Sequence, residues 1–291
     1  MTLPLSILRP LSRHGCLKVV ASIIIGIDPT IFNLGSLAIG WHGVFMVLGI
    51  IVGIWLTLRL AKRAGISEEF IYASAFLVIL FGLIGARLVH VLDNLGYYWD
   101  NPGQILAFWE GGLAWYGGLV GGVLAVVVYA KVRKFSLGHF ADAAAPSVIL
   151  GLAIGRIGCT INGDAYGTPT SLPWGLVYTH SPYAPFWVAG HPAPVYEIIW
   201  NLIVFALLWR LRGRLKPPGA LFLLMIAMYS FGRFFISWVR VEPAVAGPLH
   251  QAHFISLILF LGAVALLAYN KVAWVKPEIA RRTSGDKPNE P

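Results

Sequence analysis

An arginine stands inside the apolar, glycine-spaced stretch LGLAIGRIGCTINGDAYGT, residues 150–168. Arg156 is energetically unfavourable at such a position, because inserting a charged side chain at the centre of a membrane helix costs about 2.5–3.5 kcal/mol on insertion scales. The polar and turn-forming residues that follow are Asn162, Asp164, Tyr166 and Gly167. We interpret this stretch as the floor of a binding site for an anionic lipid headgroup.

A second group of polar residues shares one face of a later helix. Its members are Tyr229, Arg233, Ser237 and Arg240. They follow one another at i, i+4, i+8 and i+11, a spacing that brings two guanidinium groups into line. A guanidinium fork matches phosphate oxygens with two parallel hydrogen bonds. The arginines therefore indicate a phosphate as the ligand.

The composition is that of an integral membrane protein. Of the 291 residues, 57% are hydrophobic and 12% are charged, whereas soluble domains average about 25% charged residues. Two cysteines, Cys16 and Cys159, are too few for a disulfide framework. The glycine pairs Gly49–Gly53 and Gly117–Gly121 are typical of close helix packing in membranes. We expect an all-α fold, a polytopic bundle of membrane-spanning helices.

Seven apolar stretches are candidate membrane spans. They cover residues 36–58, 71–92, 111–130, 142–160, 194–209, 219–239 and 250–270. The connections 59–70, 131–141, 210–218 and 271–291 hold three, three, four and five Lys or Arg residues, and 93–110, 161–193 and 241–249 hold none. Because cytoplasmic loops carry the excess of basic residues, this alternation predicts seven transmembrane helices with the N-terminus outside and the C-terminus cytoplasmic. The net charge of +9 is then explained by the basic residues of the cytoplasmic connections, which argues against nucleic-acid binding.

The chain divides into three parts on this interpretation. Residues 1–27 form a basic N-terminal extension or interfacial arm, whose apolar run is too short to span a bilayer. Residues 28–275 form one transmembrane domain. The polar residues 276–291 form a disordered cytoplasmic tail.

The predicted topology gathers the polar residues of the helices into one layer near the outer membrane surface. The layer holds His42, Arg87, His90, Tyr116, Arg156, Asn162, Asp164, His191, Tyr196, Glu197, Tyr229, Arg233 and Arg240. Six helices contribute to it, which is not expected of scattered structural polar residues. Simpler interpretations stay open for some members. Arg87 and Arg240 could extend to the interface, and His42 and Tyr116 could be interfacial anchors.

Six segments, in order, match those of a known family. They are IDPTIFNLGSLAIGWHG (27–43), GARLVHVLDN (85–94), WEGGLAWYGGLVGG (109–122), GRIGCTINGDAYG (155–167), HPAPVYE (191–197) and YSFGRFFISWVR (229–240). The fourth segment carries a specific pattern, GR-x-G-x-x-x-NG-x-x-x-G. In these segments the chain resembles bacterial phosphatidylglycerol–prolipoprotein diacylglyceryl transferases, and the resemblance covers residues 27–269.

The resemblance implies a reaction and a location. The diacylglyceryl group of phosphatidylglycerol would move to the lipobox cysteine thiol of a secreted precursor, and glycerol phosphate would leave. The enzyme would lie in the bacterial plasma (inner) membrane with its active site on the extracytoplasmic side. His42 and Tyr116 stand where the family has Tyr and His, and three further differences from the family are Cys159, Asp164 and Ser237.

The implied reaction needs an ionised thiol, a stabilised phosphate leaving group and an in-line arrangement of the two. We assign Arg156 and Arg233 to the phosphate as catalytic residues. His42 is assigned as the base, because an imidazole titrates near neutral pH, and Tyr116 as the residue that orients His42 or the phosphate. The His42/Tyr116 exchange leaves the identity of the base open.

The predicted substrate-binding residues are Arg87, Asn162, Asp164, Tyr166, Gly167, His191, Tyr196, Glu197, Tyr229 and Arg240. No cofactor is expected. No metal is expected either, because the sequence shows no His/Cys/Asp cluster with ligand spacing. Cys159 is not expected to be a nucleophile, because its apolar flank gives no reason for a lowered pKa.

The expected partners are phosphatidylglycerol, lipobox-containing prolipoproteins and the membrane, with no nucleic acid. Three alternatives remain at this point. One is a transporter, although an odd number of spans and the lack of an obvious repeat argue against inverted-repeat carriers. The second is a lipid-binding relative without catalysis. The third is a transferase for another anionic lipid or acceptor.

Overall fold

The computed structural model describes residues 22–274, apart from 36, 64 and 109–110. The expected tail 276–291 and all but the last six residues of the expected extension 1–27 lie outside this range. Seven apolar helices form the body of the described chain. They are α1 Trp41–Arg63, α2 Glu68–Asp93, α4 Trp115–Val132, α5 Leu137–Asn162, α6 Ala193–Leu211, α7 Ala220–Ile236 and α8 Gln251–Tyr269.

Each helix overlaps one of the seven predicted spans. By length and composition α1, α2, α5, α6 and α8 are able to cross a membrane, while the apolar parts of α4 and α7, Tyr116–Val132 and Ala220–Ile236, are shorter. Large apolar side chains are exposed along the helices, such as Phe76 on α2 and Ile258 on α8. This is the surface expected of a polytopic helical membrane protein, whose outer face contacts hydrocarbon rather than water.

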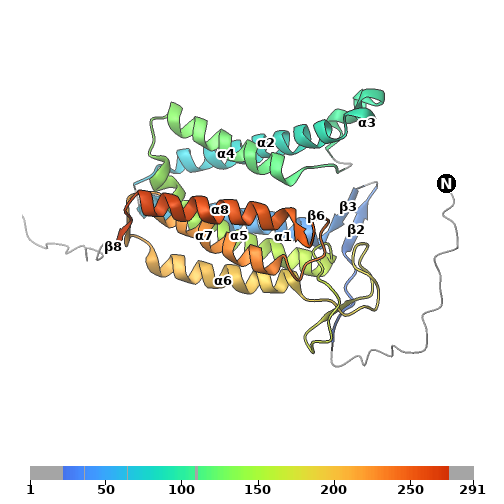
Figure 1. Ribbon diagram of the computed structural model, residues 1–291. Helices are drawn as coiled ribbons and strands as arrows, with labels where there is room; N and C mark the ends of the chain where they lie inside the picture. Colours follow the sequence, from blue (N-terminus) through green and yellow to red (C-terminus); the bar gives the residue numbers. More distant parts are fainter. Residues whose placement is uncertain (1–21, 36, 64, 109–110, 275–291) are drawn as a thin grey trace, which may run out of the picture.

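The helices run alongside one another in two groups (Figure 1). The hairpin of α2 and α4 lies beside a body formed by the other five helices, and the most extensive helix contacts are α1 with α5 and α2 with α4. Glycines bring both pairs together. A Cβ on Gly49 would lie 2.7 Å from the carbonyl oxygen of Gly151, and one on Gly117 would collide with the carbonyl oxygen of Gly85. The predicted packing role of these glycines is confirmed.

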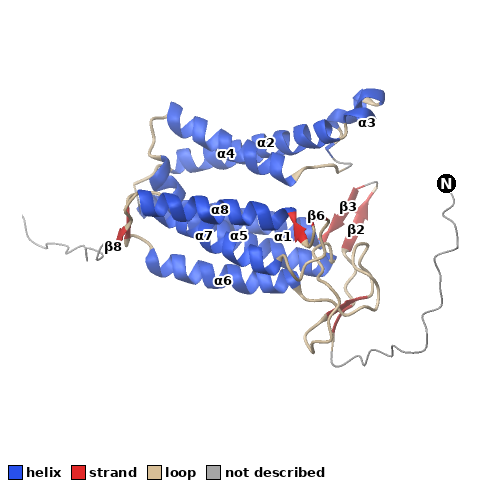
Figure 2. Cartoon of the chain, in the orientation of Figure 1, coloured by secondary structure: helices blue, strands red, loops and turns tan. Residues whose placement is uncertain are grey.

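Short strands make the fold less purely helical than expected (Figure 2). They are β1 Ile23–Ile25, β2 Thr30–Leu34, β3 Leu37–Gly40, β4 Leu176–Tyr178, β5 Leu215–Lys216, β6 Ala244–Ala246, β7 Leu249–His250 and β8 Ala273–Trp274. They form four two-stranded sheets, β1–β4, β2–β3, β5–β8 and β6–β7. The strands pair the backbone groups of the connections between helices, which would otherwise remain unsatisfied.

Several predicted helix boundaries are wrong by a few residues. The third and fourth spans are predicted from residues 111 and 142, but α4 begins at Trp115 and α5 at Leu137. The first span was expected from residue 36, but residues 37–40 pair with β2 and the helix begins at Trp41. The sixth was expected to continue to residue 239, but α7 ends at Ile236. The chain beyond it pairs with the loop after α5, since Thr168 N donates to Val239 O and Val241 N donates to Tyr166 O. Residues 237–239 form a turn after the helix, in which Trp238 N and Val239 N donate three residues back, to Phe235 O and Ile236 O.

One end of the bundle positions the polar residues. The start of α1, the end of α5, the start of α6, the end of α7 and the start of α8 all lie at the end that carries β2, β3 and β6 (Figure 1). A short helix α3, Leu95–Asp100, and a 3-10 turn η1, Pro102–Leu106, follow α2. The long connection between α5 and α6 contains β4, which pairs in parallel with β1.

Candidate active site

Three arginines converge on one carboxylate. Glu197, on the first turns of α6, is almost fully buried, with 3% of its side chain exposed. Its Oε2 lies 2.5 Å from Nε of Arg156 on α5. Its Oε1 lies 2.8 Å from NH1 of Arg233 on α7 and 3.3 Å from NH1 of Arg240. The two arginines assigned to the phosphate therefore point into one region, and Arg240 joins them.

A second carboxylate completes this cluster. Oε1 of Glu242 lies 2.5 Å from NH2 of Arg233 and 3.1 Å from Nε of Arg240. The arginine cluster, defined as Arg156, Arg233, Arg240, Glu197 and Glu242, thus holds three positive and two negative charges. Its net charge of +1 equals the charge that one phosphodiester would neutralise.

Arg240 reaches the cluster from outside the helix. The expected continuous face through residue 240 is wrong, because α7 ends four residues earlier. Arg240 is held instead by an isolated antiparallel bridge with Gly167. A Cβ on Gly167 would lie 2.6 Å from the carbonyl oxygen of Val239, so glycine permits this close approach. Burial, and then the nearby Arg233 charge, lower the pKa of the Arg240 guanidinium from its ordinary value.

A second group of side chains lies beside Arg156. The thiol Sγ of Cys159 is 3.6 Å from Arg156 NH1 and 3.7 Å from His42 Nδ1. The same Nδ1 is 3.5 Å from Oδ2 of Asp164. We call His42, Cys159 and Asp164 the thiol cluster. It adjoins the arginine cluster through Arg156, which contacts both.

Glycine allows the thiol cluster to form. A Cβ on Gly158 of α5 would lie 2.8 Å from Cα of His42 and 3.2 Å from its carbonyl oxygen. A larger residue at position 158 would push α1 away from α5 and His42 away from Cys159. Gly163 then ends α5 in a left-handed conformation, with φ of 75°, and turns the chain toward Asp164.

The thiol cluster corrects one expectation. Imidazole, thiol and carboxylate are ligands for transition metals, and these three offer atoms that lie within 4.8 Å of one another. The sequence had shown no such cluster, because His42 and Cys159 are 117 positions apart. Their proximity depends on the packing of α1 against α5 and not on local spacing.

Two of the four tyrosines of the predicted site, Tyr116 and Tyr229, lie near the arginine cluster. The hydroxyl of Tyr116 is within electrostatic range of Arg233, Glu242 and Tyr229, and Tyr229 is within such range of Arg156. His42 belongs to the thiol cluster, where its Nδ1 contacts Cys159 and Asp164. Within the described part of the chain, no hydrogen bond joins Tyr116 to His42. His42 and Tyr116, which stand where the family has Tyr and His, therefore lie near different clusters of the site.

Arg87 has a different environment from the one expected. Its guanidinium donates to the carbonyl oxygens of Ile105 at 2.9 Å, Gly111 at 2.6 Å, Gly112 at 3.0 Å and Gln104 at 2.5 Å. Four of its five N–H groups are used in this way. These hydrogen bonds hold the loop between α2 and α4, and they leave few N–H groups of Arg87 to bind a phosphate. His90 lies against the same loop, next to Gly112.

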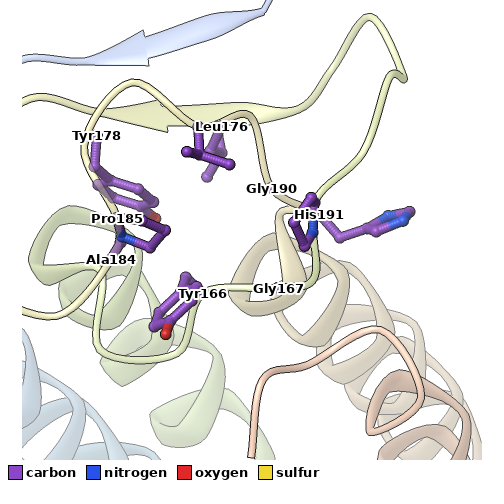
Figure 3. Close-up of a pocket in the computed structure, with 10 residues that line it drawn as sticks. Tyr166, Gly167, Leu176, Tyr178, Ala184, Pro185, Gly190 and His191 are labelled. Atoms are coloured by element: carbon purple, nitrogen blue, oxygen red, sulfur yellow. The ribbon is translucent and has the colours of Figure 1, made fainter. Parts of the chain in front are cut away.

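The remaining predicted residues lie in, or at the ends of, the connection between α5 and α6. We call this connection, residues 163–192, the loop layer. Asn162 is the last residue of α5, and its carbonyl oxygen accepts from Ser181 Oγ at 2.8 Å. A small cavity lies in this layer, lined among others by Tyr166, Gly167, Leu176, Tyr178 and His191 (Figure 3).

The ring of His191 points away from this cavity (Figure 3). Its Nδ1 lies 3.4 Å from the hydroxyl of Tyr196, which also accepts from Trp174 Nε1 at 2.9 Å. These contacts join the loop to the start of α6. Tyr196, on the first turn of α6, therefore contacts His191 and Trp174 of the preceding connection.

Sequence reasoning missed two members of the site. Glu242 is not among the predicted site residues, although it follows Arg240 by two residues. Cys159 was set aside because of its apolar flank, although it stands three residues after Arg156 on the same helix face. In both cases the spacing from a functional arginine was the available signal.

The fold and these two clusters define a polytopic membrane protein with a charged site at one end of its helical bundle. Residues 29–269 match the family model described as prolipoprotein diacylglyceryl transferase. The chain therefore belongs to the prolipoprotein diacylglyceryl transferase family, and it is a transferase of lipoprotein biosynthesis.

Curated relatives cover most of the chain. A phosphatidylglycerol–prolipoprotein diacylglyceryl transferase of Dehalococcoides mccartyi is 37% identical over 249 residues, which are 85% of this chain and 95% of that protein. The enzyme of Clostridioides difficile is 38% identical over 242 residues, 83% and 95% of the two chains. The enzyme of Staphylococcus aureus is 35% identical over 258 residues, 86% and 91%.

Proposed function

We propose that this protein transfers the diacylglyceryl group of phosphatidylglycerol to the lipobox cysteine thiol of a prolipoprotein, with release of glycerol phosphate. The observation that carries the site assignment is the arginine cluster. Each of its three guanidiniums makes two contacts with described side chains, although each has five N–H groups. Donors remain for a phosphate, and one phosphodiester anion would neutralise the cluster.

The arginines would act on the leaving group. In the reaction the acceptor sulfur attacks the glyceryl carbon that carries the phosphate, and the C–O bond to the phosphate breaks. Negative charge then develops on the departing phosphate, where Arg156, Arg233 and Arg240 would stabilise it. Because their carboxylate partners hold them before the lipid arrives, little reorganisation is needed during the reaction. Glu197 and Glu242 are positioning residues in this scheme.

The acceptor thiol would be activated beside His42. The His42 side chain is 38% exposed, and Asp164 contacts its Nδ1, so Nε2 is the nitrogen available to a substrate. An imidazole oriented by a carboxylate is an effective proton acceptor at neutral pH. The thiol cluster adjoins the arginine cluster through Arg156, an arrangement that suits a thiol attacking a carbon next to the bound phosphate. Tyr116 and Tyr229 would flank the phosphate.

The remaining site residues would bind the substrates less directly. Asn162, Tyr166, Gly167, His191 and Tyr196 would shape the loop layer through which the precursor peptide approaches. Arg87 would position the loop after α2.

The same proposal includes the membrane arrangement. The single transmembrane domain 28–275 would cross the bacterial inner membrane seven times, with its N-terminus outside and its C-terminus cytoplasmic. The alternation of basic and uncharged connections supports this orientation. With this orientation the site would lie on the extracytoplasmic side, where secreted precursors would present their lipobox cysteine.

The test is a transfer assay with the purified protein in detergent. A lipobox peptide is incubated with phosphatidylglycerol, and its mass is measured. We expect a gain equal to one diacylglyceryl group. A matched peptide with serine in place of the cysteine should gain nothing, and neither should the cysteine peptide with phosphatidylcholine in place of phosphatidylglycerol. A protein that binds phosphatidylglycerol but leaves the cysteine peptide unmodified would contradict the proposal.

A further inference from the structure

The thiol cluster brings together three metal-ligand atoms that the transferase scheme uses only in part. Atoms of His42, Cys159 and Asp164 lie within 4.8 Å of one another. We propose that these three side chains bind a divalent transition-metal ion of the Zn²⁺ type, with a fourth coordination position open to a substrate thiol. This goes beyond the family assignment, because all three ligands stand at positions where this chain differs from the family pattern.

The two separations that involve His42 Nδ1 are close to those of a tetrahedral ion, and the thiol and carboxylate atoms lie within 4.8 Å of each other. Zinc binds sulfur at about 2.3 Å, histidine nitrogen at about 2.0–2.1 Å and carboxylate oxygen at about 2.0–2.2 Å. At tetrahedral angles these lengths separate sulfur from nitrogen by about 3.5 Å and nitrogen from oxygen by about 3.4 Å. The corresponding separations are 3.7 Å between Cys159 Sγ and His42 Nδ1 and 3.5 Å between that Nδ1 and Asp164 Oδ2. Small side-chain movements would close the remaining difference.

The donor set selects the class of ion. A thiolate and an imidazole favour Zn²⁺ and related transition ions, whereas Mg²⁺ and Ca²⁺ require oxygen ligands. Three protein ligands leave one position open, as in catalytic zinc sites. A further observation concerns Asp164. Its Oδ1 is buried and has no hydrogen-bond partner among the described residues, so this carboxylate has capacity for a ligand that the folded chain does not use.

One neighbour opposes the ion. Arg156 NH1 lies 3.6 Å from Cys159 Sγ, where its charge stabilises a thiolate but repels a dication. Glu197 offsets this charge, because its Oε2 pairs with Nε of the same arginine. A thiolate and a carboxylate together balance the two charges of the ion. We therefore expect an exchangeable ion that chelators remove, rather than a permanently held structural ion.

The use of this site rests on the proposed function. A thiol that coordinates zinc is deprotonated by the ion. The acceptor cysteine would lose its proton to solvent on taking the fourth position, and its sulfur would then attack the glyceryl carbon as the C–O bond to the phosphate breaks. With the ion bound, the metal and not the His42 imidazole would ionise the thiol. The site is accessible, since His42 and Asp164 have 38% and 28% of their side chains exposed.

Cobalt provides a test that does not depend on activity. The full-length protein in detergent is stripped with a chelator and titrated with Co²⁺ alone. We expect one ion per chain, with the visible absorption of tetrahedral Co²⁺ and a near-ultraviolet thiolate-to-cobalt band, both removed by added Zn²⁺. Cys159→Ser should lose the thiolate band. Cys16→Ser, which changes the other cysteine of the chain, should retain it. A band that survives in Cys159→Ser, or no Co²⁺ binding at all, would overturn the proposal.

Two more measurements guard against indirect effects. His42→Ala should weaken Co²⁺ binding while thermal unfolding shows an intact fold, and unchanged affinity in this variant would also refute the site. Addition of the lipobox cysteine peptide to the Co²⁺ form should strengthen the thiolate band, whereas the serine peptide should not. An active transferase that binds no Co²⁺ would refute the metal site alone, and a Co²⁺ site in a protein without transfer activity would refute the proposed function alone.

Discussion

Arg87 and Arg156 are both arginines within apolar helices, but the structure gives them different partners. Arg87 is buried and donates to four backbone carbonyl oxygens of the loop that follows its own helix. Arg156 contacts a carboxylate and a thiol, as part of a cluster of opposite charges. The cost of placing an arginine in such a helix is similar in the two cases. The partner, and not the burial, distinguishes an arginine that supports a loop from one able to bind an anion.

The comparison also shows how a charged site can be prepared in advance. Around Arg87 the donors are almost fully used, so the residue has a fixed structural task. In the arginine cluster the carboxylates hold the guanidiniums in place but use only part of their donors. Such an arrangement is rigid before the ligand arrives and still able to bind it.

The largest effect is expected from Glu197→Gln, which removes the central counter-charge of the arginine cluster. Breaking a buried ion pair costs about 3–5 kcal/mol, because the remaining charges are left uncompensated. The free energy of unfolding in detergent should fall by that amount. Glu68→Gln is the control, because Glu68 pairs with Lys62 at the surface with 57% of its side chain exposed and should change stability by about 0–1 kcal/mol. Equal effects of the two variants would show that the cluster does not depend on its carboxylate.

Arg156→Lys should affect chemistry more than folding. A lysine keeps the positive charge but loses the planar fork, and loss of one charge-stabilising donor typically reduces turnover by about 10²–10³-fold. The mass-based transfer assay measures this rate. Arg59→Lys, at the other end of α1, should transfer at the normal rate. Normal turnover in Arg156→Lys would remove the phosphate role of this arginine.

Arg87→Lys should give the opposite profile. Lysine is unable to reach four carbonyl oxygens in the same geometry, and each hydrogen bond to a charged group contributes about 1.5–3 kcal/mol. We expect a loss of stability in that range, measured by thermal unfolding, with turnover at saturating lipid reduced less than tenfold. If this variant instead unfolds normally and loses turnover as Arg156→Lys does, the two arginines have the same task and the comparison fails.

The smallest effect is expected from Gly158→Ala, which tests the contact that forms the thiol cluster. Overpacking between α1 and α5 should cost about 1–3 kcal/mol of stability. Gly43→Ala is the matched control on α1, because a Cβ there would contact nothing within 4 Å; it should be neutral or slightly stabilising. A Gly158→Ala protein as stable as Gly43→Ala would show that the close helix contact is not needed.

The parts of the fold that depend on composition were predictable. Hydropathy and the basic connections located all seven apolar helices, because each local stretch carries its own signal. The convergence of Arg156 and Arg233 was also foreseeable, since both stand within apolar helices, where an isolated charge is costly. These predictions needed no knowledge of which helices pack together.

The rest depended on long-range backbone geometry. The carbonyl groups around Arg87 belong to a loop whose shape no residue spacing reveals. Beyond the end of α7 the chain pairs with residues 166–168, so the position of Arg240 does not follow from helical periodicity. Cys159 meets His42 only because glycines let α5 approach α1. The pattern of residues within one segment does not show which distant segments that segment contacts.

A carboxylate shared among three arginines also makes the energetics of the cluster collective. Residues that contact one partner show coupling energies of about 0.5–3 kcal/mol, so the effects of replacing Arg156, Arg233 and Arg240 will not add. Once one guanidinium is gone, Glu197 redistributes its attraction to the other two. Redesign of the headgroup specificity therefore has to treat the arginines and their shared acid as one unit, changed together.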